Sequence, residues 1–200
     1  MLVSVFYRNK CAKSQFLRIA IREMFWEFHE YNVDDPDSKE KLIQLKKGLG
    51  SGFEPITPAI QTKEAYSHEL FGIIEYLYEC NPTGSMYSDQ PSTRLVSRTI
   101  LYRVFRELTP IWERYQTSGS PDELVAYFRK SVPLIEAVIQ GVKAYRSNIE
   151  IPCYVDILLA ILTLEANRHI PIPNKEIRDW ISTMSNRKSF AELIPEFQEE

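Results

Sequence analysis

The sequence predicts an α+β protein in which a small βαβαββα domain precedes an all-helical domain. Short runs of β-favouring residues alternate with helical patterns only in the first 80 residues. The segment NPTGSMYSDQP (81–91) is rich in turn formers and has no periodicity. Beyond it, every apolar pattern has helical spacing. We therefore expect domains at residues 1–80 and 91–200, joined by a linker at 81–90.

Strand and helix alternate in the first half of the N-terminal domain. LVSVFY (2–7) is a short, mostly apolar run that favours a strand, and apolar positions through residues 16–24 indicate a helix after it. FHEYNV (28–33) alternates in character like a second strand. A charged helix over 34–47 follows, and the glycines of GLGSG end it.

The second half of this domain predicts a hairpin and a closing helix. PAIQT (58–62) and AYS (65–67) are two short strands separated by the polar pair KE. Ser67 is a suitable cap for a helix over 68–79. A parallel pair of strands followed by an antiparallel hairpin and a last helix is the thioredoxin-like arrangement.

The C-terminal half predicts a helical bundle. Apolar residues recur at steps of three and four from Leu101 to Tyr115, and Pro110 should bend that helix. A second long helix is expected over 121–141. The segment IPCYVDILLAILTLEA (151–166) is apolar almost all round, so it should be the central buried helix. Two shorter segments close the chain, one at 174–184 and one beginning near Ser189.

Composition excludes several classes of protein. The chain has 24 basic and 27 acidic residues, and residues 1–80 hold 10 and 12 of them, so neither half is a basic nucleic-acid-binding domain. The longest apolar run, ILLAILTL, is far shorter than the roughly 20 residues of a membrane span. MLVSVFYRNK lacks the features of a secretory signal, and the three scattered cysteines favour a reducing, cytoplasmic setting. The three histidines are equally scattered, so no metal site is expected.

Two long segments resemble the glutathione S-transferase superfamily. FEPITPAIQTKEAYSHELFGIIEYLYE resembles the family's stretch in which a cis-proline precedes a strand, a hairpin and a glutamate-serine pair. Thr57 and Pro58 take the position of the cis-proline pair, and Glu69 and Leu70 take that of glutamate-serine. IRDWISTMSNRKSF (177–190) resembles the family's closing helix. The resemblance implies a thioredoxin-like domain with an all-helical domain, and a homo- or heterodimer.

Four further segments resemble the stringent starvation protein A group of that superfamily, which binds RNA polymerase. They are CAKSQFLRIAI, YLYECNPTGSMY, RTILYRVFRELTPIWERY and CYVDILLAILTLEA. This resemblance implies a non-enzymatic transcription regulator that acts in stress and has RNA polymerase as its partner. The group carries a proline-histidine-proline surface motif, where this chain has Pro82, Thr83 and Gly84.

Cys11 is the candidate nucleophile of the chain. It lies between Lys10 and Lys13 at the start of a predicted helix, where the helix dipole and positive charge favour a thiolate. The pattern CAKS has no second cysteine, so its thiol chemistry would be a mixed disulfide with a small thiol. The resemblance gives this position to the nucleophile of cysteine-type glutathione transferases. The other interpretation is a small, half-buried side chain at a helix start.

Two departures from the family weaken glutathione chemistry. Ala12 replaces the proline that usually follows the nucleophile, so the loop is less fixed. Leu70 replaces the serine whose hydroxyl, in the family, binds the γ-glutamyl carboxylate of glutathione. That loss would cost roughly 1–3 kcal/mol, or about ten- to a hundredfold in affinity. In the enzymes of the family, the main chain of the residue at the position of Thr57 holds the cysteinyl backbone of glutathione. For the Thr57 main chain itself three alternatives stay open, which are glutathione, another ligand or no ligand.

Arg94 and Arg98 are four residues apart on a predicted helix and therefore share a face. One interpretation is an anion site or subunit interface, with a nucleotide alarmone such as guanosine tetraphosphate as ligand. The other is a solvated face, since Glu107 can pair with Arg103 on the same helix. We expect a non-enzymatic regulator without a cofactor. The alternative is a glutathione-dependent transferase or thioltransferase that uses Cys11.

Overall fold

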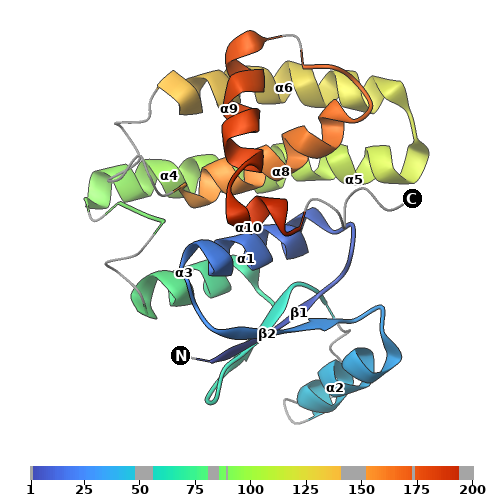
Figure 1. Ribbon diagram of the computed structural model, residues 1–200, viewed down its shortest axis with the longest axis vertical. Coiled ribbons are helices and arrows are strands. Elements are labelled where there is room, and N and C mark those ends of the chain that lie inside the picture. Colours follow the sequence, from blue (N-terminus) through green and yellow to red (C-terminus); the bar gives the residue numbers. More distant parts are fainter. Residues whose placement is uncertain are drawn as a thin grey trace. The chain divides into compact units, whose positions relative to one another are not determined.

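The computed structural model describes residues 2–47, 56–80, 86–88, 90–140, 152–172 and 174–193 (Figure 1). The chain divides into two compact units, Met1–Ser85 with Leu193–Glu200, and Met86–Glu192. The first unit contains a four-stranded sheet with helices, and the second is helical throughout its described elements. The predicted α+β class is therefore confirmed. None of the helices in the described part of the chain combines the length and apolarity needed to cross a bilayer.

The first unit follows the predicted βαβαββα order. Its elements are β1 (Val3–Tyr7), α1 (Ala12–Glu23), β2 (Phe28–Asn32), α2 (Pro36–Lys47), β3 (Ala59–Gln61), β4 (Tyr66–Ser67) and α3 (Leu70–Cys80). The sheet has the order β2-β1-β3-β4, in which β1 and β2 are parallel and the other neighbours are antiparallel. This is the predicted thioredoxin-like arrangement.

The start of α3 differs from the prediction. The helix begins at Leu70, and the carbonyl of Glu69 accepts a hydrogen bond from the amide of Ile73 at 2.9 Å. The Oγ of Ser67 accepts from the amide of Glu69 at 3.2 Å. Ser67 therefore shapes the turn between β4 and α3, and the expectation that it caps the helix was wrong.

Apolar side chains cover both faces of the sheet. α1 and α3 lie on one side of it and α2 on the other (Figure 1). On the α2 side, Leu42 packs in a buried cluster with Phe6, Val33 and Ala59. On the other side α1 is buried almost all round, which its apolar run Phe16–Ile21 predicts. The sheet is thus fixed between two helical layers.

A charged network connects α1 to β2. The Arg18 guanidinium donates to Glu30 Oε1 at 2.6 Å and Oε2 at 3.1 Å, and Arg22 donates to the same two oxygens at 2.8 and 3.0 Å. Arg18 also donates to Gln15 Oε1 at 3.0 Å and lies 3.8 Å from the centre of the Tyr7 ring. The Arg18 side chain is only 2% exposed. Burial raises the pKa of Glu30, but the hydrogen bonds and charges of the two arginines outweigh it and lower that pKa overall.

We predict that Glu30→Gln lowers the free energy of unfolding by about 3 kcal/mol at neutral pH, because it leaves a buried guanidinium without its counter-charge. The folded-state pKa of Glu30 is depressed, so its contribution is present above the unfolded value of 4.5 and is lost as pH falls through the folded value. The difference between wild type and variant should therefore shrink as the pH falls below the unfolded value of 4.5 and through the lower folded value. Urea unfolding at several pH values measures it.

Glu40→Gln is the matched control, because Glu40 is an exposed carboxylate on α2. It should change the free energy of unfolding by less than about 0.5 kcal/mol. An equal loss in both variants, or a Glu30→Gln loss that does not depend on pH, contradicts the prediction.

The second unit is a bundle around one buried helix. Its described elements are α4 (Pro91–Arg103), η1 (Val104–Leu108), α5 (Thr109–Ser118), α6 (Pro121–Gln140), α8 (Tyr154–Asn167), α9 (Lys175–Ser185) and α10 (Lys188–Ala191). Eleven of the 14 residues of α8 are buried, and it packs against α4, α6 and α9. At its start, Asp156 Oδ2 accepts from the amide of Cys153 at 2.8 Å. The prediction of a central buried helix is confirmed.

Pro110 distorts the helix that contains it, as predicted, but through a π-helical segment. The amide of Thr109 bonds to the carbonyl of Val104, five residues back, over the π-helix η1. Pro110 has no amide hydrogen to continue a regular α-helical ladder, and the wider turn accommodates that loss. Helical structure then continues through α5 to Gly119, whose φ of +64° ends it.

Candidate functional site

One edge of the sheet brings the predicted site segments together. The register pairs Phe6 with Ala59 and Ile60 with Ser67, both antiparallel. The carboxyl ends of β1 and β4 therefore meet the amino end of β3 at the same edge. The segments that leave β1 and β4 and the one that enters β3 carry the predicted site residues, which are Cys11, Thr57, Pro58, Glu69 and Leu70.

Cys11 is the N-cap residue of α1, as its position in the sequence predicted. Its backbone is extended, with φ −101° and ψ 109°, and its carbonyl accepts from the amide of Gln15 at 3.0 Å. The side chain makes no capping hydrogen bond and is half-buried. Ser14 is fully buried, and its Oγ accepts from the amide of Arg8 at 3.2 Å. Through this hydrogen bond the serine of CAKS holds the loop between β1 and α1.

The peptide bond between Thr57 and Pro58 is cis, as the resemblance predicted. Pro58 is buried and Thr57 is half-buried, and β3 begins directly after them. The pair thus lies where the chain enters the middle of the sheet. A ligand role for the Thr57 main chain stays a prediction.

Glu69 and Leu70 form the start of α3. Glu69 is exposed, and its carboxylate lies 3.6 Å from Nε2 of His68. Leu70 is half-buried at the first helical position. An aliphatic side chain can neither donate nor accept a hydrogen bond. The side chain of Leu70 therefore contributes only apolar surface to this edge.

Arg94 and Arg98 lie on α4 in the second unit and share one half-buried face, as predicted. Arg94 Nη1 donates to the carbonyl of Ser88 at 3.3 Å, and the Arg98 guanidinium carbon lies 5.3 Å from the centre of the Tyr87 ring. Both arginines therefore contact the segment that precedes α4. An anion-binding role stays a prediction.

The alternative interpretation of that helix is supported by one ion pair. Arg103 Nε lies 3.0 Å from Glu107 Oε1, and both side chains are largely exposed. The predicted partner-binding residues Pro82, Thr83 and Gly84 lie outside the described residues.

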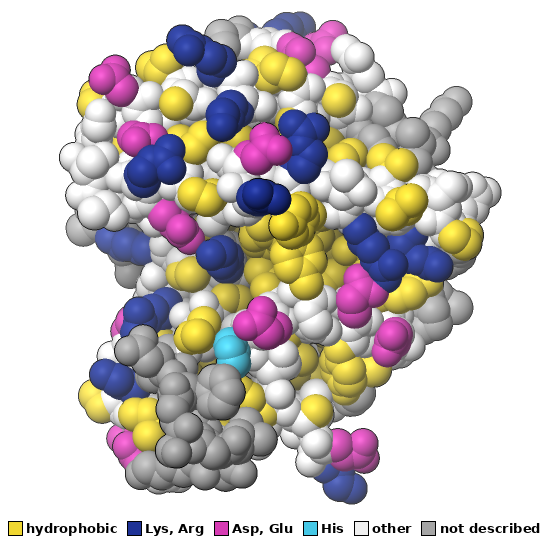
Figure 2. Space-filling model, turned by 180° about the vertical axis from the view of Figure 1, so that it is seen from behind, with side chains coloured by type: hydrophobic (Ala, Val, Ile, Leu, Met, Phe, Trp, Pro, Cys, Tyr) yellow, Lys and Arg dark blue, Asp and Glu magenta, His cyan; other side chains and the backbone are white. Residues whose placement is uncertain are grey.

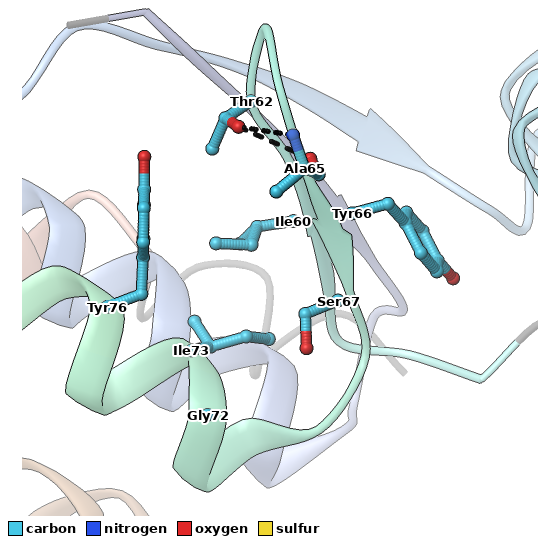
Figure 3. Close-up of a pocket in the computed structure, with 8 residues that line it drawn as sticks. All are labelled: Ile60, Thr62, Ala65, Tyr66, Ser67, Gly72, Ile73 and Tyr76. Atoms are coloured by element: carbon cyan, nitrogen blue, oxygen red, sulfur yellow. Dashed lines mark hydrogen bonds between the residues drawn. The ribbon is translucent and has the colours of Figure 1, made fainter.

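Sequence reasoning missed a small pocket on the first unit. It holds about 90 Å³ and lies between the β3–β4 hairpin and α3. Its lining residues are Ile60, Thr62, Ala65, Tyr66, Ser67, Gly72, Ile73 and Tyr76. Figure 3 shows Ile60 pointing from the hairpin toward the side of α3, which carries Ile73 and Tyr76, whereas the Tyr66 ring points to the other side of the hairpin. Gly72, a glycine inside a helical pattern, is the only signal in the sequence that points to open space here.

The sequence matches no known protein-family model and no curated protein. The structure is similar to a diazinon-metabolizing glutathione S-transferase of the silkworm Bombyx mori, with a TM-score of 0.74, 15% identity, and 99% of this chain and 96% of that chain covered. The chain has the glutathione S-transferase fold. A glutathione S-transferase from the Antarctic clam Laternula elliptica gives a TM-score of 0.74 at 11% identity, covering 100% of this chain and 95% of that one.

A third similar structure was solved with a ligand. It is a glutathione transferase homologue from Burkholderia with bound glutathione, at a TM-score of 0.65 and 17% identity, over 99% of this chain and 98% of that chain. At such identities the likeness is one of fold.

We predict that the three thiols react with a maleimide in the order of their exposure. Cys80 is exposed, Cys11 half-buried and Cys153 only 2% exposed, so Cys80 should be labelled first and Cys153 only on unfolding. Peptide mass spectrometry of samples taken over time measures this order. Labelling in urea is the control for intrinsic reactivity. If Cys11 reacts before Cys80, its thiol is chemically activated and exposure does not set the order.

Proposed function

We propose that this chain is a non-enzymatic transcription regulator of the stringent starvation protein A type. In this proposal it binds RNA polymerase through a scaffold with the glutathione S-transferase fold. The observation that carries the proposal is Leu70, half-buried at the first position of α3 on the edge shared by the predicted site residues. Neither a cofactor nor a catalytic residue is needed for this role.

At Leu70 the side chain differs from the family, whereas the backbone positions around the site agree with it. The sheet register and the N-cap position of Cys11 match the frame that the resemblance implies. A carboxylate that met the Leu70 side chain instead of a hydroxyl would lose one charge-assisted hydrogen bond. A protein that keeps the frame and loses such a contact is suited to binding a partner through its surface.

The choice of RNA polymerase as partner rests on the four sequence segments that resemble the stringent starvation protein A group. One of them, CYVDILLAILTLEA, folds as the central helix α8, and another spans α4, η1 and α5. The partner contact is proposed at Pro82, Thr83 and Gly84, and guanosine tetraphosphate as a ligand near Arg94 and Arg98. A protein with this role works in the cytoplasm.

A glutathione-dependent transferase or thioltransferase is the second candidate, and Cys11 favours it. The thiol lies at the start of a 12-residue helix and is not used to cap it. A thiolate there could attack a glutathione disulfide, form a mixed disulfide and release the other glutathione as a thiolate. The Burkholderia homologue, which was solved with bound glutathione, supports glutathione as a ligand in this proposal.

We predict that wild type binds glutathione weakly and that Leu70→Ser raises its affinity by about ten- to a hundredfold, because the hydroxyl restores the missing hydrogen bond. Isothermal titration calorimetry with reduced glutathione measures the dissociation constants. Leu70→Ala is the matched control, since it removes the apolar side chain without adding a donor. Tight binding by wild type, unchanged in Leu70→Ser, contradicts the regulator proposal and favours the second candidate.

We predict that the protein co-purifies with RNA polymerase from a native lysate, and that Cys11→Ser does so equally well. Combined replacement of residues 82–84 by alanine should reduce the recovered polymerase, because those residues are the proposed contact. Quantitative mass spectrometry of the polymerase subunits is the measurement. Recovery that falls with Cys11→Ser, or no polymerase in any sample, would sink the proposal.

A further inference from the structure

Strand β2 leaves backbone hydrogen-bonding groups open at one edge of the sheet. The amide of Val33, directly after β2, donates to the carbonyl of Tyr7 in β1 at 2.9 Å. In a parallel pair, alternate residues of a strand direct their amides and carbonyls to the same neighbour. The odd-numbered residues of β2 therefore bond to β1, whereas the amides and carbonyls of Phe28 and Glu30 point away from it.

This open edge is long enough to pair with another strand. β2 has five residues and is the outermost strand in the order β2-β1-β3-β4, so within the described ranges no strand covers it. The opposite edge strand, β4, has only two residues, and such a short strand offers little to pair with. An extended peptide can add to an open edge through main-chain hydrogen bonds. β2 is thus the edge of this sheet that is suited to strand addition.

Phe25, just before β2, has a backbone conformation that is unfavourable for its residue type. It is the first residue after the C-cap of α1, its φ is +55°, and its amide donates to the carbonyl of Arg22 at 3.0 Å. Glycine is the usual residue at such a left-handed position, because a bulky side chain strains the backbone there. Phe25 is also 92% exposed.

Exposure and strain together set Phe25 apart. Figure 2 shows hydrophobic side chains in contact with solvent among charged ones, as on most protein surfaces, so exposure alone indicates little. At Phe25 it is combined with a conformation that glycine would adopt at lower cost. Neither feature stabilises the single chain, whereas an apolar contact with a partner would bury the ring. Phe25 lies three residues before β2, so that contact would adjoin the open edge.

The middle of β2 carries an excess of positive charge. On the side of α1, the guanidinium groups of Arg18 and Arg22 share the single carboxylate of Glu30. On the side of α2, Nζ of Lys41 lies 3.8 Å from the centre of the Tyr31 ring. A carboxylate brought to the middle of this edge would therefore meet unbalanced positive charge on both sides of the sheet.

The ends of the strand have the opposite character. Glu27 precedes β2, and Asp34 and Asp35 follow it. A complementary strand should therefore carry a carboxylate at its middle and no acidic residue at its ends. A second copy of β2 fits poorly, because in a symmetric pair the arginines of one copy would meet those of the other.

We propose that the outer edge of β2 binds an extended segment of a partner protein that has a central acidic residue flanked by uncharged, partly apolar ones. The segment adds as a fifth strand, its backbone bonding to Phe28 and Glu30, its carboxylate near Arg22 and an apolar side chain against Phe25. This surface shares no residue with the predicted glutathione site or the proposed polymerase contact. The proposal goes beyond the proposed function, and either can fail alone.

Amide hydrogen exchange measured by NMR tests this pairing. The probe is the peptide Thr-Val-Thr-Glu-Thr-Val-Thr, acetylated and amidated so that only the glutamate is charged. At saturation it should slow exchange at Phe28 and Glu30 by at least about tenfold, because their amides gain acceptors. The amides of His29 and Tyr31, which bond to β1, are the internal control and should exchange slowly throughout. Unchanged exchange at Phe28 and Glu30 overturns the proposal, as does protection that appears without peptide when the protein is concentrated.

Variants and a second peptide test the two side-chain contacts. Phe25→Gly should weaken peptide binding by at least about tenfold without lowering the melting temperature, because glycine removes the ring and relieves the strained backbone. Phe71→Ala is the matched control, since Phe71 is another exposed phenylalanine, on α3, and its loss should leave the affinity unchanged. A peptide with lysine in place of glutamate should bind at least about tenfold more weakly. Equal affinity for both peptides, or an unchanged affinity in Phe25→Gly, overturns the proposal.

Discussion

The carboxylate of Glu30 is the fixed point of the first unit, because it accepts hydrogen bonds from two guanidinium groups of α1 at once. Arg18 is buried, so removing its charge from water is costly unless the carboxylate and Gln15 complete its hydrogen bonds. The network joins the middle of α1 to β2. Since β2 is parallel to β1, it also fixes where the amino end of α1 lies relative to the sheet, and with it the place of Cys11.

The frame of the site and the groups that would touch a ligand depend on different residues. Sheet register, the buried Pro58 and the Arg18–Glu30 pair set the positions of the three segments at the edge. The side chain at position 70 lies at the start of α3, half-buried, and takes no part in that frame. The chemistry of the edge can therefore change while the fold stays the same, which is why likeness to glutathione transferases settles the fold and leaves the activity open.

Local patterns predicted the fold well, because they reflect burial. The apolar run of α8 follows directly from which side chains leave water, and this helix was located from the sequence. The sequence was less informative where backbone hydrogen bonds compete. The Oγ of Ser67 accepts from the amide of Glu69, which lies one residue before the first residue of α3. Pro110 is accommodated by a π-helical segment, and the spacing of apolar residues does not distinguish such a segment from an α-helix. The pocket beside Gly72 depends on how the β3–β4 hairpin packs against α3, and the burial of Arg18 depends on how α1 packs against β2, so no spacing within a single element could show them.

Overall charge counts likewise do not show how charges are distributed between neighbouring helices. The basic and acidic residues are nearly balanced in residues 1–80 and in residues 81–200. Balance over a hundred residues nevertheless conceals two neighbouring segments of opposite sign, one acidic on α3 and one basic on α4. Each places its charges beside exposed apolar side chains, so its apolar surface is left in water in the single chain.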